Sequence, residues 1–446
     1  MTFIKATLGE IAATQYGLVD GPFGSDLPAR LYTDEGIPVV RGVNLSLGDL
    51  RFNDGNYKYV SPETADQLKR SNCYPGDIVF TKKGTIGQTG LIPLTSRYKR
   101  FLLSSNQMKI TLRRDVALPE YVYYYVSSPD IRRRIIAEST SCGVPKTNVT
   151  YLRAFPILLP PLTTQCKIAA ILSAYDDLIE NNLRRIKILE EMAQNLYREW
   201  FVKFRFPGHQ HARFTDSPLG RIPEGWQAIR FADLLASGLG GDWGLDEPDD
   251  KEDAPVFVIR GTDFNDVVTG TSLRTPKRFI APSSQEKRQL RVGDLLVENS
   301  VNAKSRCVGT TLLITDGILG RLRDPAIAAS FCKVYRFKDP SLAALAHLHM
   351  RHLRDEGKMA FYQNVAANGI GNFQSQRFLE SEHLIFPLDL QERRNMLDFL
   401  GFLTTSILAD QAFTLRRTRD LLLPRLISGE VDVSELDIAV PEEAGA

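Results

Sequence analysis

The chain has 446 residues, 43% hydrophobic and 24% charged, which is the composition of an ordinary globular protein with room for two or three domains. No run approaches about 18 apolar residues, so the sequence predicts no membrane span, and the opening MTFIKATLGEIAATQ lacks the apolar core of a secretion signal. The net charge of +2 does not by itself indicate a nucleic-acid ligand.

The cysteines are odd in number and never spaced C-x-x-C, which argues against a disulfide framework or a structural zinc site. They are Cys73, Cys142, Cys166, Cys307 and Cys332. This pattern predicts a protein of the reducing cytoplasm.

Charge is uneven along the chain. Residues 97–114 hold six basic residues and no acidic one, whereas residues 246–253 form an acidic loop. A nucleic-acid face and an ordinary solvated surface both explain such runs.

The predicted elements begin with a strand-rich domain over residues 1–160. Its strands are short apolar or alternating runs between Gly, Pro, Asn and Asp, such as the GDIVF run that starts at Gly76. After Pro161 the pattern changes to helical, and we expect a long helix within residues 161–206, from about Thr163 to Phe204.

This helix carries a heptad seam. With Leu172 at position a, the ten a and d positions from Ile168 to Trp200 include one polar residue, Asn182. Asn182 is either a buried residue that fixes the register or an exposed residue on a slightly rotated helix.

The second half repeats this order. Residues 207–226, rich in Pro, Gly and polar residues, are predicted to be a linker. A second strand-rich domain follows over 227–386, then a second long helix over 387–430 that ends near Gly429, and a tail over 431–446. The predicted fold class is therefore α+β, with two similar mixed, strand-rich domains and two long helices.

Four short segments of the first half have similar segments, here called echoes, in the same order in the second half. This repetition indicates an internal duplication. GIPVVRGVNL is echoed by APVFVIRGTDF, YPGDIVF by RVGDLLV, FPILLPPLTTQ by EHLIFPLDLQ, and NLRRIKILEEM by TLRRTRDLLLP. Each echo is weak alone, but together they predict that the two halves share one architecture.

The second helix shows a looser apolar stripe, and two such stripes satisfy each other as an antiparallel coiled coil. The predicted seam consists of Leu172, Ile179, Asn182, Ile186, Leu189 and Leu196 in the first helix, and Leu400, Ile407, Leu415 and Leu422 in the second.

No catalytic motif is found. The chain lacks G-x-x-x-x-G-K-[ST] and a G-x-G-x-x-G after a strand, as well as the Asn-Pro-Pro-Tyr type of motif that holds a flipped base. Three histidines cluster at His347, His349 and His352, but no carboxylate completes a set of zinc ligands there. We therefore predict no metal and no catalytic residue.

Loops rich in hydrogen-bonding residues follow the apolar strands at equivalent points of both halves. Lys and Arg suit phosphate oxygens and guanine edges, and Asn and Gln can pair with adenine, although any one of these loops could be an ordinary polar loop. The candidate DNA-contacting residues are Lys82, Lys83, Thr85, Gln88, Asn106, Lys146 and Asn148 in the first half, and Asn299, Lys304, Arg306, Asn368 and Gln374 in the second.

The order of these segments resembles the specificity subunit of type I restriction–modification enzymes over nearly the whole chain. The most specific pieces are the segment SPLGRIPEGW at 217–226, Gly-Gly-Asp-Trp at 240–243, and LLPRLISGE at 422–430. The opening of the first half at 13–28 departs from the Gly-Gly-Asp-Trp type, so the two domains are expected to read different DNA sequences.

The resemblance implies a non-catalytic subunit that binds double-stranded DNA, each domain reading one half of a split sequence. It also implies that the helices separate the domains and dock two methyltransferase subunits, which bring S-adenosylmethionine. Further motor and restriction subunits would use ATP and magnesium, so no cofactor is expected in this chain.

The alternatives to a specificity subunit are a stand-alone DNA-binding regulator and an autonomous methyltransferase or nuclease. A stand-alone DNA-binding regulator would purify alone, whereas a specificity subunit should co-purify with a methyltransferase chain. An autonomous methyltransferase or nuclease would need the cofactor motifs that this sequence lacks.

Overall fold

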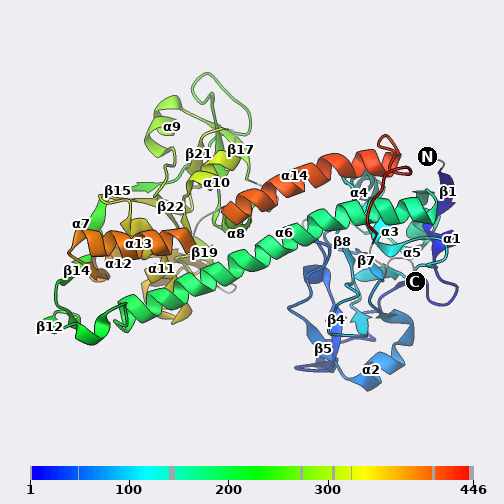
Figure 1. The fold of residues 1–446 in the computed structure, drawn as a ribbon, viewed down its shortest axis with the longest axis horizontal. Helices are drawn as coiled ribbons and strands as arrows, with labels where there is room; N and C mark the ends of the chain where they lie inside the picture. The colour runs from blue at the N-terminus through cyan, green and yellow to red at the C-terminus, as the bar shows by residue number, and fades with distance from the viewer. Residues whose placement is uncertain are drawn as a thin grey trace. The chain divides into compact units, whose positions relative to one another are not determined.

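The computed structural model describes residues 3–48, 50–139, 146–271, 275–303, 307–322, 324–403 and 407–440. It divides into two compact units, the first formed by Met1–Glu180 with Thr414–Ala446 and the second by Asn181–Phe413 (Figure 1). Each unit contains one strand-rich region and part of the long helices. Because this division cuts across the helices, the domain bounds drawn from the sequence stay a prediction.

The first unit is built on two sheets and a strand pair. The four-stranded sheet has the order β2 (Leu18–Asp20), β10 (Gln107–Ile110), β7 (Ile78–Thr81) and β8 (Thr89–Leu91). The five-stranded sheet has the order β3 (Tyr32–Thr33), β5 (Lys58–Val60), β4 (Ile37–Val40), β9 (Phe101–Leu103) and β6 (Asn72–Cys73), and β1 (Ile4–Thr7) pairs with β11 (Pro156–Leu159). The helices are α1 (Leu8–Ile11), α2 (Pro62–Gln67), α3 (Pro119–Ser127), α4 (Pro129–Ala137) and α5 (Val149–Ala154).

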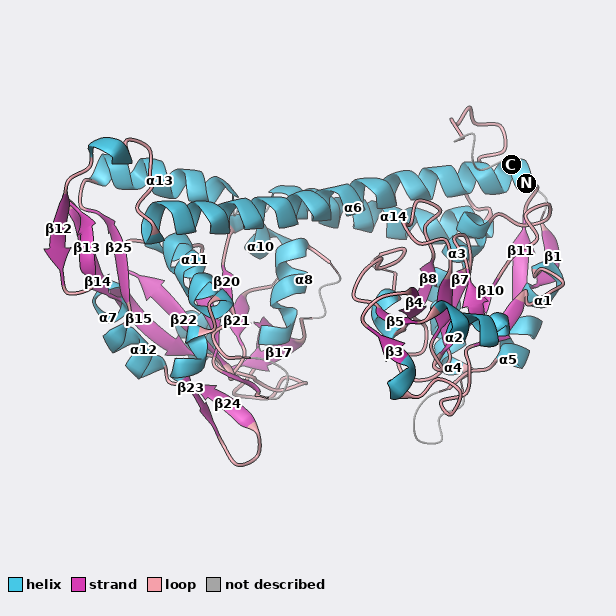
Figure 2. Ribbon diagram, turned by 90° about the horizontal axis from the view of Figure 1, so that it is seen from below, coloured by secondary structure: helices cyan, strands magenta, loops and turns pink. Residues whose placement is uncertain are grey.

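The second unit repeats the four-stranded sheet and the strand pair, has a three-stranded sheet in place of the five-stranded one, and adds two small sheets (Figure 2). Its four-stranded sheet has the order β15 (Leu235–Gly240), β22 (Cys332–Phe337), β18 (Leu295–Glu298) and β20 (Thr311–Leu313). Two sheets have three strands, one with the order β17 (Lys277–Ile280), β16 (Ala254–Ile259) and β21 (Ala326–Ala328), the other with the order β19 (Ser300–Asn302), β24 (Ile370–Phe373) and β23 (Gln363–Val365). Two strand pairs complete the unit, β14 (Trp226–Arg230) with β25 (His383–Pro387) and β12 (Phe214–Ser217) with β13 (Gly220–Pro223). The shorter helices are α7 (Phe231–Leu234), α8 (Phe264–Thr269), α9 (Pro282–Arg288), α10 (Asp316–Arg321), α11 (Leu342–Asp355) and α12 (Ser375–Ser381).

The two four-stranded sheets have the same strand order, which confirms the predicted similarity of the two regions. In both, the strand after the Gly-Asp echo lies second from one edge, between an antiparallel partner on each side. The other large sheet of each region is similar in one respect. The Arg-Gly echo follows β4 in the first region and β16 in the second, and each of these strands has one antiparallel and one parallel neighbour.

The Gly-Asp echo has a physical cause. Asp77 is buried, accepts a hydrogen bond from the Tyr74 amide at 2.9 Å, and accepts another from Lys109 Nζ at 2.8 Å. Asp294 is buried in the same way, with the Arg291 amide at 2.9 Å and Arg336 Nε at 2.9 Å. Each aspartate closes the turn and places its charge against a cation, so the strand that follows begins at a fixed point.

The long helices are α6 (Leu162–Tyr197), α13 (Leu390–Leu403) and α14 (Ile407–Ser428), and α14 runs antiparallel to α6 (Figure 1). Leu172, Ile179 and Ile186 are buried on α6, as heptad spacing requires. Asn182 is 8% exposed and donates to Gln411 Oε1 at 3.5 Å, so it is a buried polar residue of the seam.

Two expectations about the second helix need correction or qualification, and the predicted linker bounds stay a prediction. Ile407 is 57% exposed, so it does not belong to the buried seam. The single second helix predicted from Leu390 is described as α13 and α14, and residues 404–406 between them lie outside the described residues. The segment predicted to be a linker contains the β12–β13 hairpin.

The remaining seam residues lie at intermediate depth or in the core. Leu189 and Leu196 are partly buried against the core of the second unit, in which Leu400 is fully buried. Leu415 is half-buried, and Leu422 packs against the core of the first unit. No helix in the described part of the chain is long and apolar enough to span a membrane.

Candidate nucleic-acid interface

Three polar loops of the first unit that are far apart in the sequence meet where β7 ends and β10 begins, in the middle of the four-stranded sheet. The Lys82 amide donates to the Asn106 carbonyl at 2.7 Å, and the Thr147 amide donates to the Lys82 carbonyl at 3.0 Å. Lys83 also forms an isolated β-bridge with Lys146. Backbone hydrogen bonds therefore hold the loops that follow β7 and β9 against the segment that leads into α5.

An open groove of about 590 Å³ lies beside these loops. Its lining contains four of the residues predicted from the sequence, namely Lys83, Thr85, Gln88 and Asn106. It also contains residues that sequence reasoning missed, which are Tyr32, Arg41, Gly42, Val43, Leu45, Thr81, Ser104, Ser105 and Gln107. We call this groove, with this lining, the first-unit groove.

The first-unit groove is positively charged and polar. Lys83, Thr85 and Asn106 are exposed on its rim. Arg41 follows β4, and its Nη2 donates to the Asn56 carbonyl at 2.7 Å, which fixes the guanidinium beside the opening. None of the described lining residues is acidic, so the groove suits an anionic ligand rich in hydrogen-bond acceptors.

Arg41 could have been found from the sequence, because it belongs to the Arg-Gly echo that repeats at Arg260. Gln107 could not, because it lies within a strand and reaches the groove only through the pairing of β10 with β7, in which it stands opposite Thr81.

Lys82 differs from its neighbour Lys83. Its Nζ donates to Asp20 Oδ2 at 2.7 Å, and both side chains are partly buried. Burial by itself would raise the pKa of Asp20, but the Lys82 ammonium holds that pKa below its usual value. The charge of Lys82 is thus already compensated, which makes Lys83 the stronger candidate for a phosphate contact.

Lys146 is exposed near the groove. Asn148 is exposed too, but its side chain caps α5 by accepting from the Tyr151 amide at 2.8 Å. That local role explains an asparagine at this position without any ligand.

In the second unit, Asn299 follows β18 as Lys82 follows β7. Its neighbour Ser300 donates to Asn372 Oδ1 at 2.8 Å across the β19–β24 pair. These contacts place two asparagine side chains close to the strand end that carries Asn299.

The other candidates of the second unit are more scattered. Asn368 lies in the turn of the β23–β24 hairpin, where it accepts from the Ile370 amide at 3.1 Å (Figure 2). Gln374 precedes α12 and accepts from Arg377 Nη1 at 3.2 Å. Lys304 and Arg306 lie outside the described residues.

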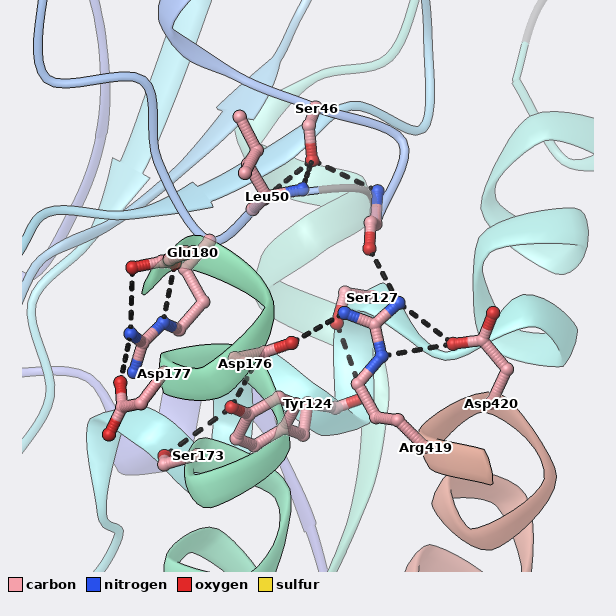
Figure 3. A network of polar contacts seen from close by, with 12 residues as sticks. Ser46, Leu50, Tyr124, Ser127, Ser173, Asp176, Asp177, Glu180, Arg419 and Asp420 are labelled. Carbon is pink, nitrogen blue, oxygen red and sulfur yellow. Dashed lines mark hydrogen bonds and ion pairs between the residues drawn. The ribbon is translucent and has the colours of Figure 1, made fainter. Parts of the chain in front are cut away.

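A buried polar network fixes the first strand-rich region to its part of the long helices (Figure 3). Asp176 on α6 accepts from Tyr124 OH at 2.7 Å and from Arg419 Nη1 at 2.5 Å, and Arg419 Nη2 donates to the Gly48 carbonyl at 2.8 Å. Burial by itself would lower the pKa of Arg419, but the Asp176 carboxylate raises that pKa above its usual value. Arg419 is therefore a permanent cation in this network.

A second contact fixes the loop that leads from the first-unit groove. Arg51 Nε and Nη2 donate to the two carboxylate oxygens of Glu180 at 3.0 Å each, and Arg51 also contacts Asp177 (Figure 3). Such two-pronged pairing fixes orientation as well as distance.

The second unit has its own anchor. Arg321 at the end of α10 contacts Asp410 on α14 and donates to the Val267 carbonyl at 2.6 Å. Gly270 ends α8 with φ +60°, and a β-carbon there would lie 2.6 Å from the Ala409 carbonyl oxygen. Only glycine fits this close approach to α14 without strain.

The histidine cluster is part of the core of the second unit. Tyr197 OH lies 2.7 Å from His349 Nδ1, and His349 Nε2 lies 3.3 Å from Glu382 Oε2. Across the described ranges, no three His, Cys, Asp or Glu side chains are placed to hold a metal ion.

Known proteins share both the sequence and the fold. A model of the type I restriction modification DNA specificity domain matches residues 44–191. The type I restriction enzyme MjaIX specificity subunit of Methanocaldococcus jannaschii is 28% identical over 167 residues, 37% of each chain. The type I restriction enzyme HindI specificity subunit of Haemophilus influenzae is 24% identical over 409 residues, 78% of this chain and 87% of that one.

The fold is matched by the crystal structure of a type I restriction–modification S subunit from M. genitalium. That match has a TM-score of 0.51 and 14% identity, and it covers 96% of both chains. The first curated relative is matched over only 37% of its own length.

The chain is therefore similar to type I restriction–modification specificity subunits, in sequence over residues 44–191 and in fold over most of its length. Its first unit adds a polar groove with no acidic residue among the described lining residues.

Proposed function

We propose that this chain is the DNA-recognition subunit of a type I restriction–modification complex, and that each strand-rich region reads one half of a two-part DNA sequence. The observation that carries the proposal is the first-unit groove, which gathers lysine, arginine, amide and hydroxyl groups from separate loops and has no acidic residue among its described lining residues. Cations suit phosphate oxygens, and amides and hydroxyls suit base edges.

The chain acts with partners that perform the chemistry. Two methyltransferase subunits bring S-adenosylmethionine, and motor and restriction subunits use ATP and magnesium. Similarity to type I specificity subunits supports these partners, and α6 offers one apolar position for docking: Ile188 and Met192 are exposed and lie four residues apart on one helical face.

The test is a map of methylated adenines in a host with and without this gene. Methylation at a two-part sequence should disappear when the gene is deleted and return when it is restored. The purified chain alone should transfer no methyl group from S-adenosylmethionine and should cut no DNA with ATP and magnesium. Turnover by the chain free of partners would refute the non-catalytic role, and an unchanged methylation map would refute DNA recognition.

Co-purification separates this proposal from a stand-alone regulator. The tagged chain should be recovered with a chain that carries a methyltransferase motif. A chain recovered alone, bound tightly to one continuous sequence, would favour the regulator.

A further inference from the structure

Two glutamine side chains meet at the floor of the first-unit groove. Gln107 lies on β10 and is 2% exposed, whereas Gln88 lies in the loop after β7 and is half-buried. A β-carbon on Gly42 would lie 3.6 Å from Gln88 Oε1 and 3.8 Å from Gln107 Nε2. Three separate segments thus bring both amides to one point.

Both amide oxygens are already engaged by hydroxyl groups of the protein. Thr81 Oγ1 donates to Gln88 Oε1 at 3.2 Å, and Ser104 Oγ donates to Gln107 Oε1. Thr81 and Gln107 also stand opposite each other in the β7–β10 pair, so the backbone register fixes this arrangement. One lone pair of each oxygen is thus in use, whereas both N–H donors of each Nε2 remain for a ligand.

The charged residues of the groove are hydrogen-bond donors, like the Nε2 groups of the two glutamines. The ammonium of Lys83 and the guanidinium of Arg41 can only donate. A ligand edge that fits this floor must therefore present acceptors.

The four base pairs differ in this respect in the major groove of DNA. Guanine presents two neighbouring acceptors, N7 and O6, whereas adenine presents one acceptor and one donor, cytosine presents a donor, and thymine presents one acceptor beside a methyl group. The usual two-pronged contact of glutamine with adenine needs an amide oxygen as well as an amide nitrogen, and here each oxygen already accepts a hydrogen bond from a protein hydroxyl, which disfavours adenine relative to guanine.

We propose that the floor of the first-unit groove reads a guanine, with Gln107 Nε2 and Gln88 Nε2 donating to its O6 and N7. This assignment rests on the proposed function and adds the identity of one base. Gln107 and Gln88 determine specificity, whereas Lys83 contributes affinity for the phosphate backbone.

The test converts the donors into acceptors without changing their shape. Gln88→Glu and Gln107→Glu are each expressed with the partner subunits in host cells that carry a plasmid library with the two-part site randomised, and methylated sites are sequenced. Gln67→Glu on α2, an exposed glutamine outside the groove lining, is the matched control.

We expect one guanine position in one half of the site to lose its preference by about 5- to 150-fold in each groove variant, because one good two-pronged contact discriminates by about 1–3 kcal/mol. Cytosine, which donates through N4, should gain at that position. The other half of the site and the Gln67→Glu control should be unchanged.

Gln88→Glu keeps the proposal falsifiable even if the buried Gln107→Glu fails to fold. Methylation by Gln88→Glu at an unchanged set of sites would overturn the guanine assignment, and so would a half-site in which the affected base is adenine, cytosine or thymine. Those outcomes leave the proposed function intact. An original chain that directs no methylation to a two-part sequence would refute the proposed function itself.

Discussion

The two strand-rich regions share the strand order of their four-stranded sheets but differ where a ligand would be read. Asp77 and Asp294 are buried at the start of equivalent strands, so Thr81 in β7 corresponds to Glu298 in β18. By the same registers, Gln107 opposite Thr81 corresponds to Cys332 opposite Glu298. The duplication has kept the residues that hold the sheet and changed the residues at its polar edge.

This difference predicts that the two regions read different bases. At the floor of the first-unit groove lie the amide of Gln107 and the hydroxyl of Thr81. The corresponding groups in the second region are the thiol of Cys332 and the carboxylate of Glu298. An ionised carboxylate can accept hydrogen bonds but not donate them, whereas an amide does both, so the two positions offer a ligand different hydrogen-bonding groups. The half-sites should therefore differ in sequence.

The two regions also differ in how they are anchored to the helices. The Asp176 carboxylate that holds Arg419 is 4% exposed, whereas the Asp410 carboxylate that holds Arg321 is 41% exposed. Losing the cation leaves a buried charge in the first unit and a hydrated charge in the second.

The largest expected effect follows from this contrast. Arg419→Ala should destabilise the first unit by about 3–5 kcal/mol, because it leaves the buried Asp176 side chain without its cationic partner. Arg321→Ala should cost the second unit about 1–3 kcal/mol, mainly through the unsatisfied Val267 carbonyl. Hydrogen exchange at α3 and α10 measures the two units separately.

Arg417→Ala, an exposed neighbour on α14, is the control and should change neither unit. Equal losses from the Arg419 and Arg321 variants would contradict the difference in anchoring.

The next effect concerns two adjacent lysines. Lys83→Ala should weaken binding of the assembled complex to all DNA sequences and reduce the slope of log affinity against log salt by about one. Lys82→Ala should have a smaller effect on the slope, since Asp20 already neutralises that ammonium. Binding is measured from low to high salt, and an equal change for both variants would show that the Asp20 contact does not withhold Lys82 from DNA.

The last expected effect distinguishes the two units by how their stability depends on pH. All six histidines lie in the second unit, and burial, followed by the charge of Arg351, lowers the pKa of His347 to about 4. Neutral His347 therefore contributes stability that is fully present above about pH 6.5 and is lost as pH falls toward about 4, by at most about 3 kcal/mol.

Hydrogen exchange at α11 between pH 7 and pH 4.5 checks this loss. His347→Gln can keep a hydrogen bond to Thr311, which lies 2.9 Å from His347 Nδ1, and should flatten the pH dependence of the second unit. An unchanged slope in that variant would show that another group is responsible.

The sequence predicted those features that depend on local pattern. The heptad spacing placed Leu172, Ile179 and Ile186 in the core, and the Gly-Asp echo marked equivalent turns. Both succeed because burial and turn chemistry repeat at short range.

The sequence failed where a distant partner decides the outcome. Lys82 is paired with Asp20, 62 positions away, and Gln107 reaches the groove only through the register of β10. Ile407 fits the apolar stripe by spacing but is 57% exposed, because spacing along one helix does not say which positions a neighbouring element covers.

The central claim is that each strand-rich region reads one half of a two-part site. The most direct measurement is a methylation map of host cells that carry the original chain, Gln88→Glu in the first region, or Asn299→Asp in the second. The account predicts that the two variants change bases in different halves, each leaving the other half and the gap unaltered. Two variants that change the same half, or a site without two separable halves, would contradict it.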